Sequence, residues 1–299
     1  MEKIAVTFLG TANAIPTEKR NHSGILVSFS NENILFDCGE GIQRQFRFAG
    51  ISPAKITRLF ISHWHGDHIL GIPGLLQTLF MSGYQKTLHI YGPSGTKRNI
   101  ELIRQLLPNI RVSFEVHELS EGTALSSNDF SIECMQMWHG ISTFAYAVIF
   151  REKLRIDKKK LAKLKLPNSP IIKELTKGND IKIENKTIKA SQITYREPGK
   201  KITIIMDTAF NENAVKLAKN SDILITEATF SVKEKSLASE YKHLTSQDAA
   251  NIAKKSGSER LILTHLSQRY EHIPQIIEKE AKKIFRKVSI AKDLDSVIL

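Results

Sequence analysis

The chain has 299 residues, of which 41% are hydrophobic and 25% are charged. These proportions are typical of a soluble globular protein and argue against a disordered or fibrous one. No apolar run approaches the roughly 20 residues needed to cross a bilayer, so we expect no membrane partner. A formal net charge of +12 favours a polyanionic partner, most simply nucleic acid.

Predicted strands and helices are mixed throughout the first half of the chain. We expect strands at 3–9, 24–29, 34–37, 57–62, 88–91, 111–117, 130–138 and 144–150. Helices are expected at 42–46, at 74–82 and from the Gly92-Pro-Ser-Gly95 turn to about Leu107. This mixture predicts the α/β class. Cys38 and Cys134 form no CxxC pair, and we expect both to be reduced and buried.

Residues 151–177 differ in composition from the rest of the chain. They contain ten Lys and Arg against three Asp and Glu, a net charge of +7 (10 − 3) out of +12. Few large apolar residues occur there, and Pro167 and Pro170 interrupt the segment. We therefore predict a protruding basic arm of two short helices at 151–177, inserted into a single domain spanning 1–299.

Core packing is expected to resume after the arm, at 188–195. Strands should follow at 202–206, 223–227 and 261–263, with helices at 211–219, 246–255 and 273–285. No low-complexity linker separates the two halves, which favours one domain over two.

The loop after the strand at 57–62 carries three histidines and an aspartate within six residues: His63, His65, Asp67 and His68. Imidazole and carboxylate together suit zinc and similar divalent ions. His63 and His65 are two residues apart on extended chain and project the same way, whereas Asp67 and His68 follow a bend. The loop thus offers two pairs of ligands, which indicates two metal ions. This spacing resembles the signature of the metallo-β-lactamase superfamily.

Further ligands are expected where other strands end. His139, Asp207 and His265 each directly follow a predicted strand. We predict one zinc held by His63, His65 and His139, and a second held by Asp67, His68 and His265. Asp207 would bridge the two ions through its two oxygens. The remaining candidates lack this context, and we expect surface or structural roles for His22, His89, His117 and His272.

Short motifs along almost the whole chain resemble the tRNase Z family of tRNA 3′-processing endoribonucleases. They are Phe8-Leu-Gly-Thr11, Asp37-Cys-Gly-Glu-Gly41, Gly92-Pro-Ser-Gly95, Glu227-Ala-Thr-Phe230 and Thr264-His-Leu-Ser-Gln-Arg-Tyr270. The resemblance implies a four-layer αβ/βα sandwich (the metallo-β-lactamase fold), two Zn²⁺ per subunit, a homodimer, precursor tRNA as partner and a cytoplasmic location. It also implies that the basic segment is the family's flexible arm, an exosite for tRNA.

The same resemblance implies roles for individual residues. Asp67 would take a proton from the attacking water, and His243 would donate a hydrogen bond or proton at the scissile phosphate, leaving a 3′-hydroxyl. Glu227 would orient His243 and raise its pKa. The arm would contact the RNA backbone by charge, without reading sequence. Its candidate RNA-binding residues are Lys158, Lys159, Lys160, Lys163 and Lys165.

Two alternatives remain open from the sequence. The chain could be another hydrolase or phosphodiesterase of the same scaffold that acts on a small substrate, for which a basic arm has little purpose. It could instead be a non-catalytic RNA-binding protein with structural zinc. Structural zinc sites are often rich in Cys, whereas the predicted ligands include none, which favours catalysis.

Overall fold

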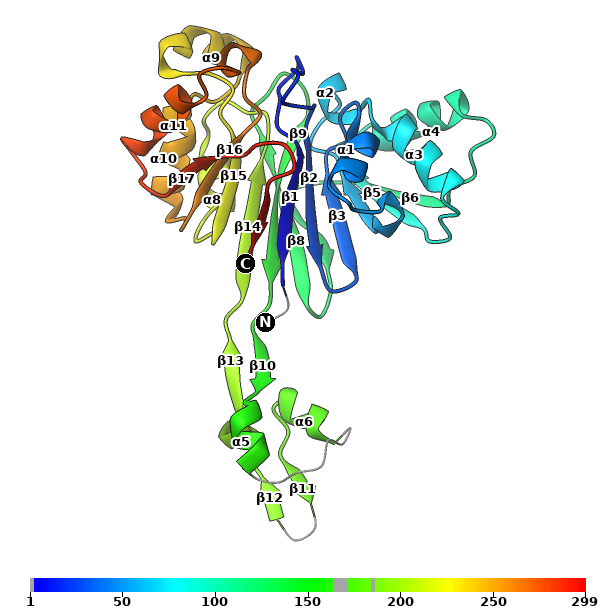
Figure 1. Cartoon of the computed structure of the whole chain (residues 1–299), viewed down its shortest axis with the longest axis vertical. Helices are drawn as coiled ribbons and strands as arrows, with labels where there is room; N and C mark the ends of the chain where they lie inside the picture. Colours follow the sequence, from blue (N-terminus) through cyan, green and yellow to red (C-terminus); the bar gives the residue numbers. More distant parts are fainter. Residues whose placement is uncertain (1–2, 164–170, 184–185) are drawn as a thin grey trace.

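The computed structural model describes residues 3–163, 171–183 and 186–299. Two large mixed sheets pack face to face, and helices cover the outer face of each (Figure 1). The α/β class and the four-layer αβ/βα sandwich expected from the sequence are confirmed. Among the described helices, none is long and apolar enough to span a membrane.

The first sheet contains β1 (Ala5–Gly10), β2 (Gly24–Phe29), β3 (Glu32–Phe36), β4 (Arg58–Phe60), β5 (Leu88–Gly92), β6 (Phe114–Glu118) and β18 (Ser296–Ile298). Its strand order is β18-β1-β2-β3-β4-β5-β6. The strands β18 to β3 pair antiparallel, and β3 to β6 pair parallel. Because β18 joins β1, the two ends of the chain lie in one sheet.

The second sheet contains β7 (Gly122–Ser126), β8 (Phe130–Met137), β9 (Thr143–Phe150), β14 (Lys200–Ile205), β15 (Ile223–Glu227), β16 (Leu261–Thr264) and β17 (Val288–Ile290). Its order is β17-β16-β15-β14-β9-β8-β7. The strands β14 to β17 pair parallel, and β7, β8, β9 and β14 pair antiparallel. The strands β7, β17 and β18 were not predicted from the sequence.

Three apolar clusters hold the layers together. The inner cluster lies between the sheets, where alternate strand residues such as Phe8 and Tyr146 face each other. The outer face of the first sheet is covered by α1 (Ile42–Phe48), α3 (Ile72–Met81) and α4 (Thr96–Leu106). The second is covered by α8 (Glu212–Leu217), α10 (Ser246–Ser256) and α11 (Gln275–Lys282). Cys38 and Cys134 are free and buried, as predicted.

Short helices occupy the connections. They are α2 (Gly66–Ile69), α9 (Lys235–Tyr241) and the 3₁₀ turns η1 (Pro53–Lys55), η2 (Val232–Glu234) and η3 (Gln268–Tyr270). The end of the sandwich that carries α2 and α9 is opposite the end from which a narrow stalk and a small head project (Figure 1).

The stalk is the antiparallel pair β10 (Lys153–Ile156) and β13 (Thr194–Glu197). The head contains α5 (Lys158–Lys163), α6 (Ile172–Thr176), β11 (Ile181–Ile183), β12 (Lys186–Ile188) and α7 (Ala190–Ile193). Both short helices expected in this part of the chain are present. The projection is longer than 151–177, however, and continues to β13.

The apolar run at 188–195 therefore does not belong to the main core, contrary to expectation. Ile188 and Ile193 pack with Ile172, Leu175 and Ile181 in a separate small cluster inside the head. Apolar periodicity identifies buried residues, but it does not say which core they enter. The small cluster gives the head an apolar core of its own, to which Ile181, Ile188 and Ile193 contribute from beyond residue 177.

Candidate metal centre and active site

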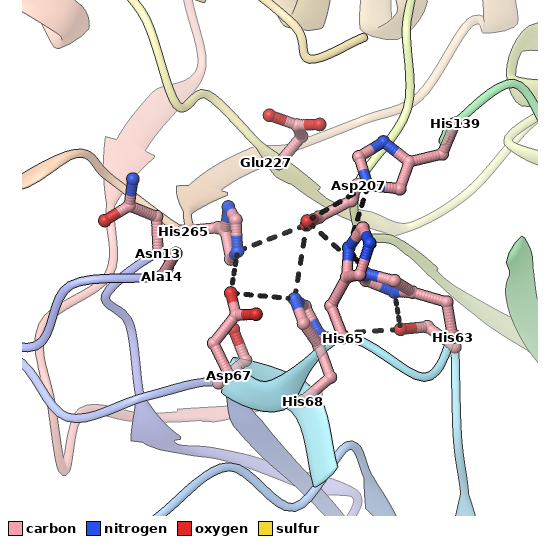
Figure 2. Close-up of polar contacts among 12 residues, drawn as sticks. Asn13, Ala14, His63, His65, Asp67, His68, His139, Asp207, Glu227 and His265 are labelled. Atoms are coloured by element: carbon pink, nitrogen blue, oxygen red, sulfur yellow. Dashed lines mark hydrogen bonds and ion pairs between the residues drawn. The ribbon is translucent and has the colours of Figure 1, made fainter. Parts of the chain in front are cut away.

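The candidate ligands lie on loops at one end of the two sheets (Figure 2). His63 follows β4, His139 follows β8, Asp207 follows β14, and His265 follows β16. The strands β8 and β14 both pair antiparallel with β9, so they run in the same direction, and β14, β15 and β16 are parallel. Their carboxyl ends therefore lie at the same end of the sheet, which is the usual position of a binding site in such sheets.

The chain direction changes within the first loop. His65 is extended (φ −76°, ψ 152°), and α2 begins at the next residue, so Asp67 lies in the first turn of that helix. The loop is fixed from below, because the hydroxyl of buried Tyr146 donates to the carbonyl oxygen of Ile61 at 2.6 Å. The bend expected between the two ligand pairs is thus the start of a short helix.

One group of ligand atoms comprises the side chains of His63, His65, His139 and Asp207. The Nδ1 atom of His65 lies 3.0 Å from Nε2 of His63 and 3.2 Å from Nε2 of His139. The Oδ2 atom of Asp207 lies 3.6 Å from Nε2 of His63 and 3.8 Å from Nε2 of His139. Four donor atoms therefore surround one point.

A second group comprises Asp67, His68, His265 and again Asp207. The Oδ2 atom of Asp67 lies 3.2 Å from Nε2 of both His68 and His265. The Oδ1 atom of Asp207 lies 3.1 Å from Nε2 of His265. Oδ2 of Asp207 faces the first group and also lies 3.4 Å from Nε2 of His68, so this carboxylate contacts donor atoms of both groups.

Two observations show that these groups fit divalent metal ions. Tetrahedral ligands at zinc–nitrogen bond lengths are separated by about 3.3 Å, and the measured separations cluster around that value. In addition, Nε2 of His68 and Oδ1 of Asp207 are buried and have no hydrogen-bond partner among the described residues. Buried polar atoms without partners are costly, and a metal ion would satisfy both.

Electrostatics in the site favour a cation. Burial and the charge on His68 hold the pKa of His63 well below its usual value, so His63 is a neutral ligand. Burial would lower the pKa of His68, but Asp207, Asp37 and Asp67 more than offset it and raise that pKa. Burial would raise the pKa of Asp67, but His68 and His265 lower it, so Asp67 is ionised.

Supporting residues orient the ligands, and this role was not predicted for them from the sequence. Asp37 accepts from Nδ1 of His68 at 2.7 Å and from the backbone N–H of Ser62 at 2.7 Å. The Oγ1 atom of Thr229 lies 3.0 Å from Nδ1 of His265. Asp37 directly follows β3, which is the same strand-end signal that identified Asp207 and His265. The loop residues Asn13 and Ala14 also lie beside this part of the site (Figure 2).

Glu227 and His243 form a pair beside the ligands. Nδ1 of His243 lies 3.0 Å from Oε1 of Glu227, and Nε2 of His243 lies 4.0 Å from Oδ2 of Asp207. Glu227 is fully buried, whereas 14% of the His243 side chain is exposed. The imidazole is therefore positioned to meet a substrate above the ligand cluster.

Three of the six non-glycine residues with positive φ among the described residues lie at this site. Asp37, Lys242 and His265 adopt positive φ angles of 59°, 55° and 57°. Such conformations are uncommon for residues other than glycine and persist where the surrounding structure enforces them. At Lys242 the result is a carbonyl oxygen 3.1 Å from Nδ1 of His139, which holds that ring in place.

Known proteins match this chain over its full length. A protein named Ribonuclease Z from Methanothermobacter thermautotrophicus is 37% identical over 294 residues, which cover 98% of this chain and 95% of that protein. The chain belongs to the ribonuclease Z family. A family model described as Anti-Pycsar protein Apyc1 also matches, over residues 4–166. That match ends before Asp207, Glu227, His243 and His265, so it includes only part of the site.

Solved structures agree with the family. The crystal structure of human tRNase Z, short form, has a TM-score of 0.72 and 28% identity, and the match covers 98% of both chains. The metallo-β-lactamase fold protein YhfI from Bacillus subtilis has a TM-score of 0.73 and 21% identity over the full length of both chains, which shows the shared fold.

The candidate RNA-binding lysines that the structure describes lie on the head. Lys158, Lys159, Lys160 and Lys163 are exposed on α5, which starts where Oδ1 of Asp157 accepts the N–H of Lys159 at 2.9 Å. Lys165 lies outside the described residues. On the stalk, by contrast, arginine side chains form ion pairs: Arg155 pairs with Glu197, and Arg196 pairs with Glu152. Exposed positive charge is thus greater on the head than on the stalk.

Proposed function

We propose that this protein is a metal-dependent endoribonuclease that removes the 3′ trailer from tRNA precursors. The observation that carries the proposal is the full-length match to Ribonuclease Z, combined with the buried His and Asp cluster beside the Glu227–His243 pair. The human structural neighbour is itself named tRNase Z. Each element needed for phosphodiester hydrolysis has a candidate group in the site.

Two zinc ions per subunit would occupy the two groups of ligands. His63, His65 and His139 would hold one ion, Asp67, His68 and His265 would hold the other, and Asp207 would bridge them. When bound, such ions supply positive charge for the phosphate and lower the pKa of water toward 7. The all-nitrogen and oxygen donor set supports a catalytic rather than a structural site.

The chain's own residues would manage two protons during the reaction. Asp67 takes a proton from the attacking water as the new oxygen–phosphorus bond forms. The phosphorus–O3′ bond breaks, and His243 donates a proton to the leaving 3′ oxygen, which becomes the 3′-hydroxyl of the tRNA. Glu227 holds His243 in the orientation and charge state that this donation requires.

The projecting basic arm would bind the body of the tRNA as an exosite inserted in the single domain. The arm projects from the end of the molecule opposite α2, the short helix that contains Asp67 and His68 (Figure 1). A tRNA cut at one site would therefore reach the arm of a second subunit, which supports the proposal of a homodimer. Exposed apolar side chains on neighbouring helices α1 and α3 offer a surface for that contact: Phe48, Phe80 and Met81.

The deciding experiment incubates the zinc-loaded protein with a tRNA precursor that carries a 3′ trailer, and maps both product ends. A single cut beside the unpaired base after the acceptor stem, with a 3′-hydroxyl on the tRNA, is expected. No cut, together with rapid hydrolysis of a chromogenic phosphodiester, would replace tRNA by a small substrate. No hydrolysis of either would favour the non-catalytic RNA-binding alternative.

A further inference from the structure

A separate group of metal-binding side chains lies near the other end of the first sheet. His89 is the second residue of β5, and Glu115 and His117 lie on the edge strand β6. The candidate active site is formed at the carboxyl ends of the strands, whereas His89 and Glu115 are close to the amino ends. From the sequence alone, we expect only surface or structural roles for both histidines.

Strand register places the three side chains on one face. His89 pairs with Glu115, and Tyr91 pairs with His117, in the parallel β5–β6 ladder. Tyr91 is buried between the two sheets, so its neighbours on that face point toward the same layer. Near the edge strand β6 these side chains are only partly buried: those of His89, Glu115 and His117 are 33%, 61% and 40% exposed. A metal ion could reach them from solvent.

The donor atoms have the spacing of a coordination shell. The Nδ1 atom of His89 lies 3.4 Å from Nε2 of His117 and 3.3 Å from Oε2 of Glu115. Nε2 of His117 lies 3.9 Å from the same oxygen. Tetrahedral ligands of zinc are about 3.3 Å apart, so small side-chain adjustments would bring all three to one ion.

Neighbouring groups affect the orientation and the charge state of these donors. The ring of Tyr91 stacks on that of His117 with centroids 4.5 Å apart and planes 16° apart, which limits rotation of the imidazole. Burial and the neighbouring His89 lower the pKa of His117, which keeps its nitrogen available as a ligand. Arg58 lies on the neighbouring strand β4, directly beside His89 in the strand register. Its positive charge is offset by an ion pair with Glu32.

We propose that His89, Glu115 and His117 form an additional binding site for a divalent transition-metal ion, with zinc the ion to test. Two imidazoles and one carboxylate are a donor set that zinc accepts in proteins, with solvent completing the coordination. The site is independent of the candidate catalytic cluster and would cross-link the edge strand β6 to β5.

The test compares the zinc content of the full-length wild type, two site variants and one control variant. Wild type, Glu115→Gln and His117→Asn are equilibrated in the same buffered micromolar free zinc, and zinc per chain is measured by mass spectrometry. Glu101→Gln, which removes an exposed carboxylate from α4, is the matched control. Imidazole NMR signals of His89 and His117 are followed during zinc titration of the wild type.

We expect the wild type and Glu101→Gln to bind one more zinc per chain than Glu115→Gln and His117→Asn, with tRNA cleavage unchanged in all four. The His89 and His117 signals should shift together as the extra ion binds. Equal zinc content in all four proteins, or histidine signals that do not respond to zinc, would overturn the proposal. Because Glu115 is the most exposed of the three, its variant should fold even if His117→Asn does not.

Discussion

The Nδ1 atom of His243 lies 3.0 Å from Oε1 of Glu227, a carboxylate with no exposed surface. Glu227 also accepts from the backbone N–H of Thr208 at 2.7 Å and from the hydroxyl of Thr229 at 2.6 Å, so its position is fixed. Burial would lower the pKa of His243, but Glu227 and Asp207 raise it to about 9. A raised pKa favours the protonated imidazole, which is the form that a general acid needs.

Replacement of this acid should slow chemistry without loss of metal. We expect His243→Ala to lower the rate of cleavage by about 10²- to 10⁴-fold, the usual range for a general acid. Zinc should stay at two per chain in the candidate catalytic cluster, because His243 is not among the seven predicted ligands. Single-turnover cleavage and mass spectrometry of bound zinc measure the two effects. His272→Ala, at an exposed histidine, is the control; loss of zinc in His243→Ala would mean that His243 is a ligand.

The pH profile should report the pairing with Glu227. An acid loses its proton as pH rises through its pKa, so activity falls on the alkaline side of the profile. Among the groups that raise the pKa of His243, Glu227 contributes most, and Glu227→Gln should lower that pKa. The alkaline limb of kcat/KM should therefore move to lower pH. An alkaline limb in the same place would show that another group is the acid.

Asp67 is predicted both to hold a metal and to accept a proton. We expect Asp67→Ala to abolish cleavage and to weaken binding of one of the two zinc ions, measured as zinc per chain across a free-zinc series. Asp37→Asn is the comparison, because Asp37 contacts His68 from the side away from the cluster. Loss of such a supporting carboxylate usually weakens metal affinity by about 10- to 100-fold. Full activity of Asp67→Ala would contradict both roles.

The arm should affect tRNA binding and not the chemical step. Replacement of Lys158, Lys159, Lys160 and Lys163 by Gln should raise KM for precursor tRNA and leave hydrolysis of a small phosphodiester unchanged. The dependence of log KM on log salt should become less steep, because fewer phosphates are neutralised. The control replaces four exposed lysines outside the arm: Lys279, Lys282, Lys283 and Lys287. Equal losses on both substrates would refute a separate role for the arm.

The dimer proposal can be tested on an exposed apolar residue. Met81 is the last residue of α3 and is 75% exposed. We expect the wild type to sediment as a dimer and Met81→Glu as a monomer at the same concentration, since a buried unpaired charge opposes association. Leu106→Glu on α4, at a residue that is 74% exposed, is the matched control and should remain dimeric. A monomeric wild type would refute the dimer.

Local sequence was enough to identify the first loop of the site and most elements of the fold. His63, His65, Asp67 and His68 are close in the chain, and an extended segment followed by a turn determines which way they point. The pattern of apolar residues in strands such as β8 and β9 is equally local. It arises because successive side chains of a strand point to opposite faces of the sheet. The ends of these strands then indicated His139, Asp207 and His265.

Only the tertiary structure determined the distances between groups that are remote in sequence. Asp207 contacts donor atoms of both ligand groups because strands that run in the same direction place their carboxyl ends at the same end of the sheet. Asp37 and Thr229 support the ligands across the same edge, and Ile188 and Ile193 enter the core of the arm's head rather than the main one. The pairing of β18 with β1 and the meeting of His89 with His117 depend on strand order. Strand order is set by packing between layers, and residue periodicity within a segment carries no information about it.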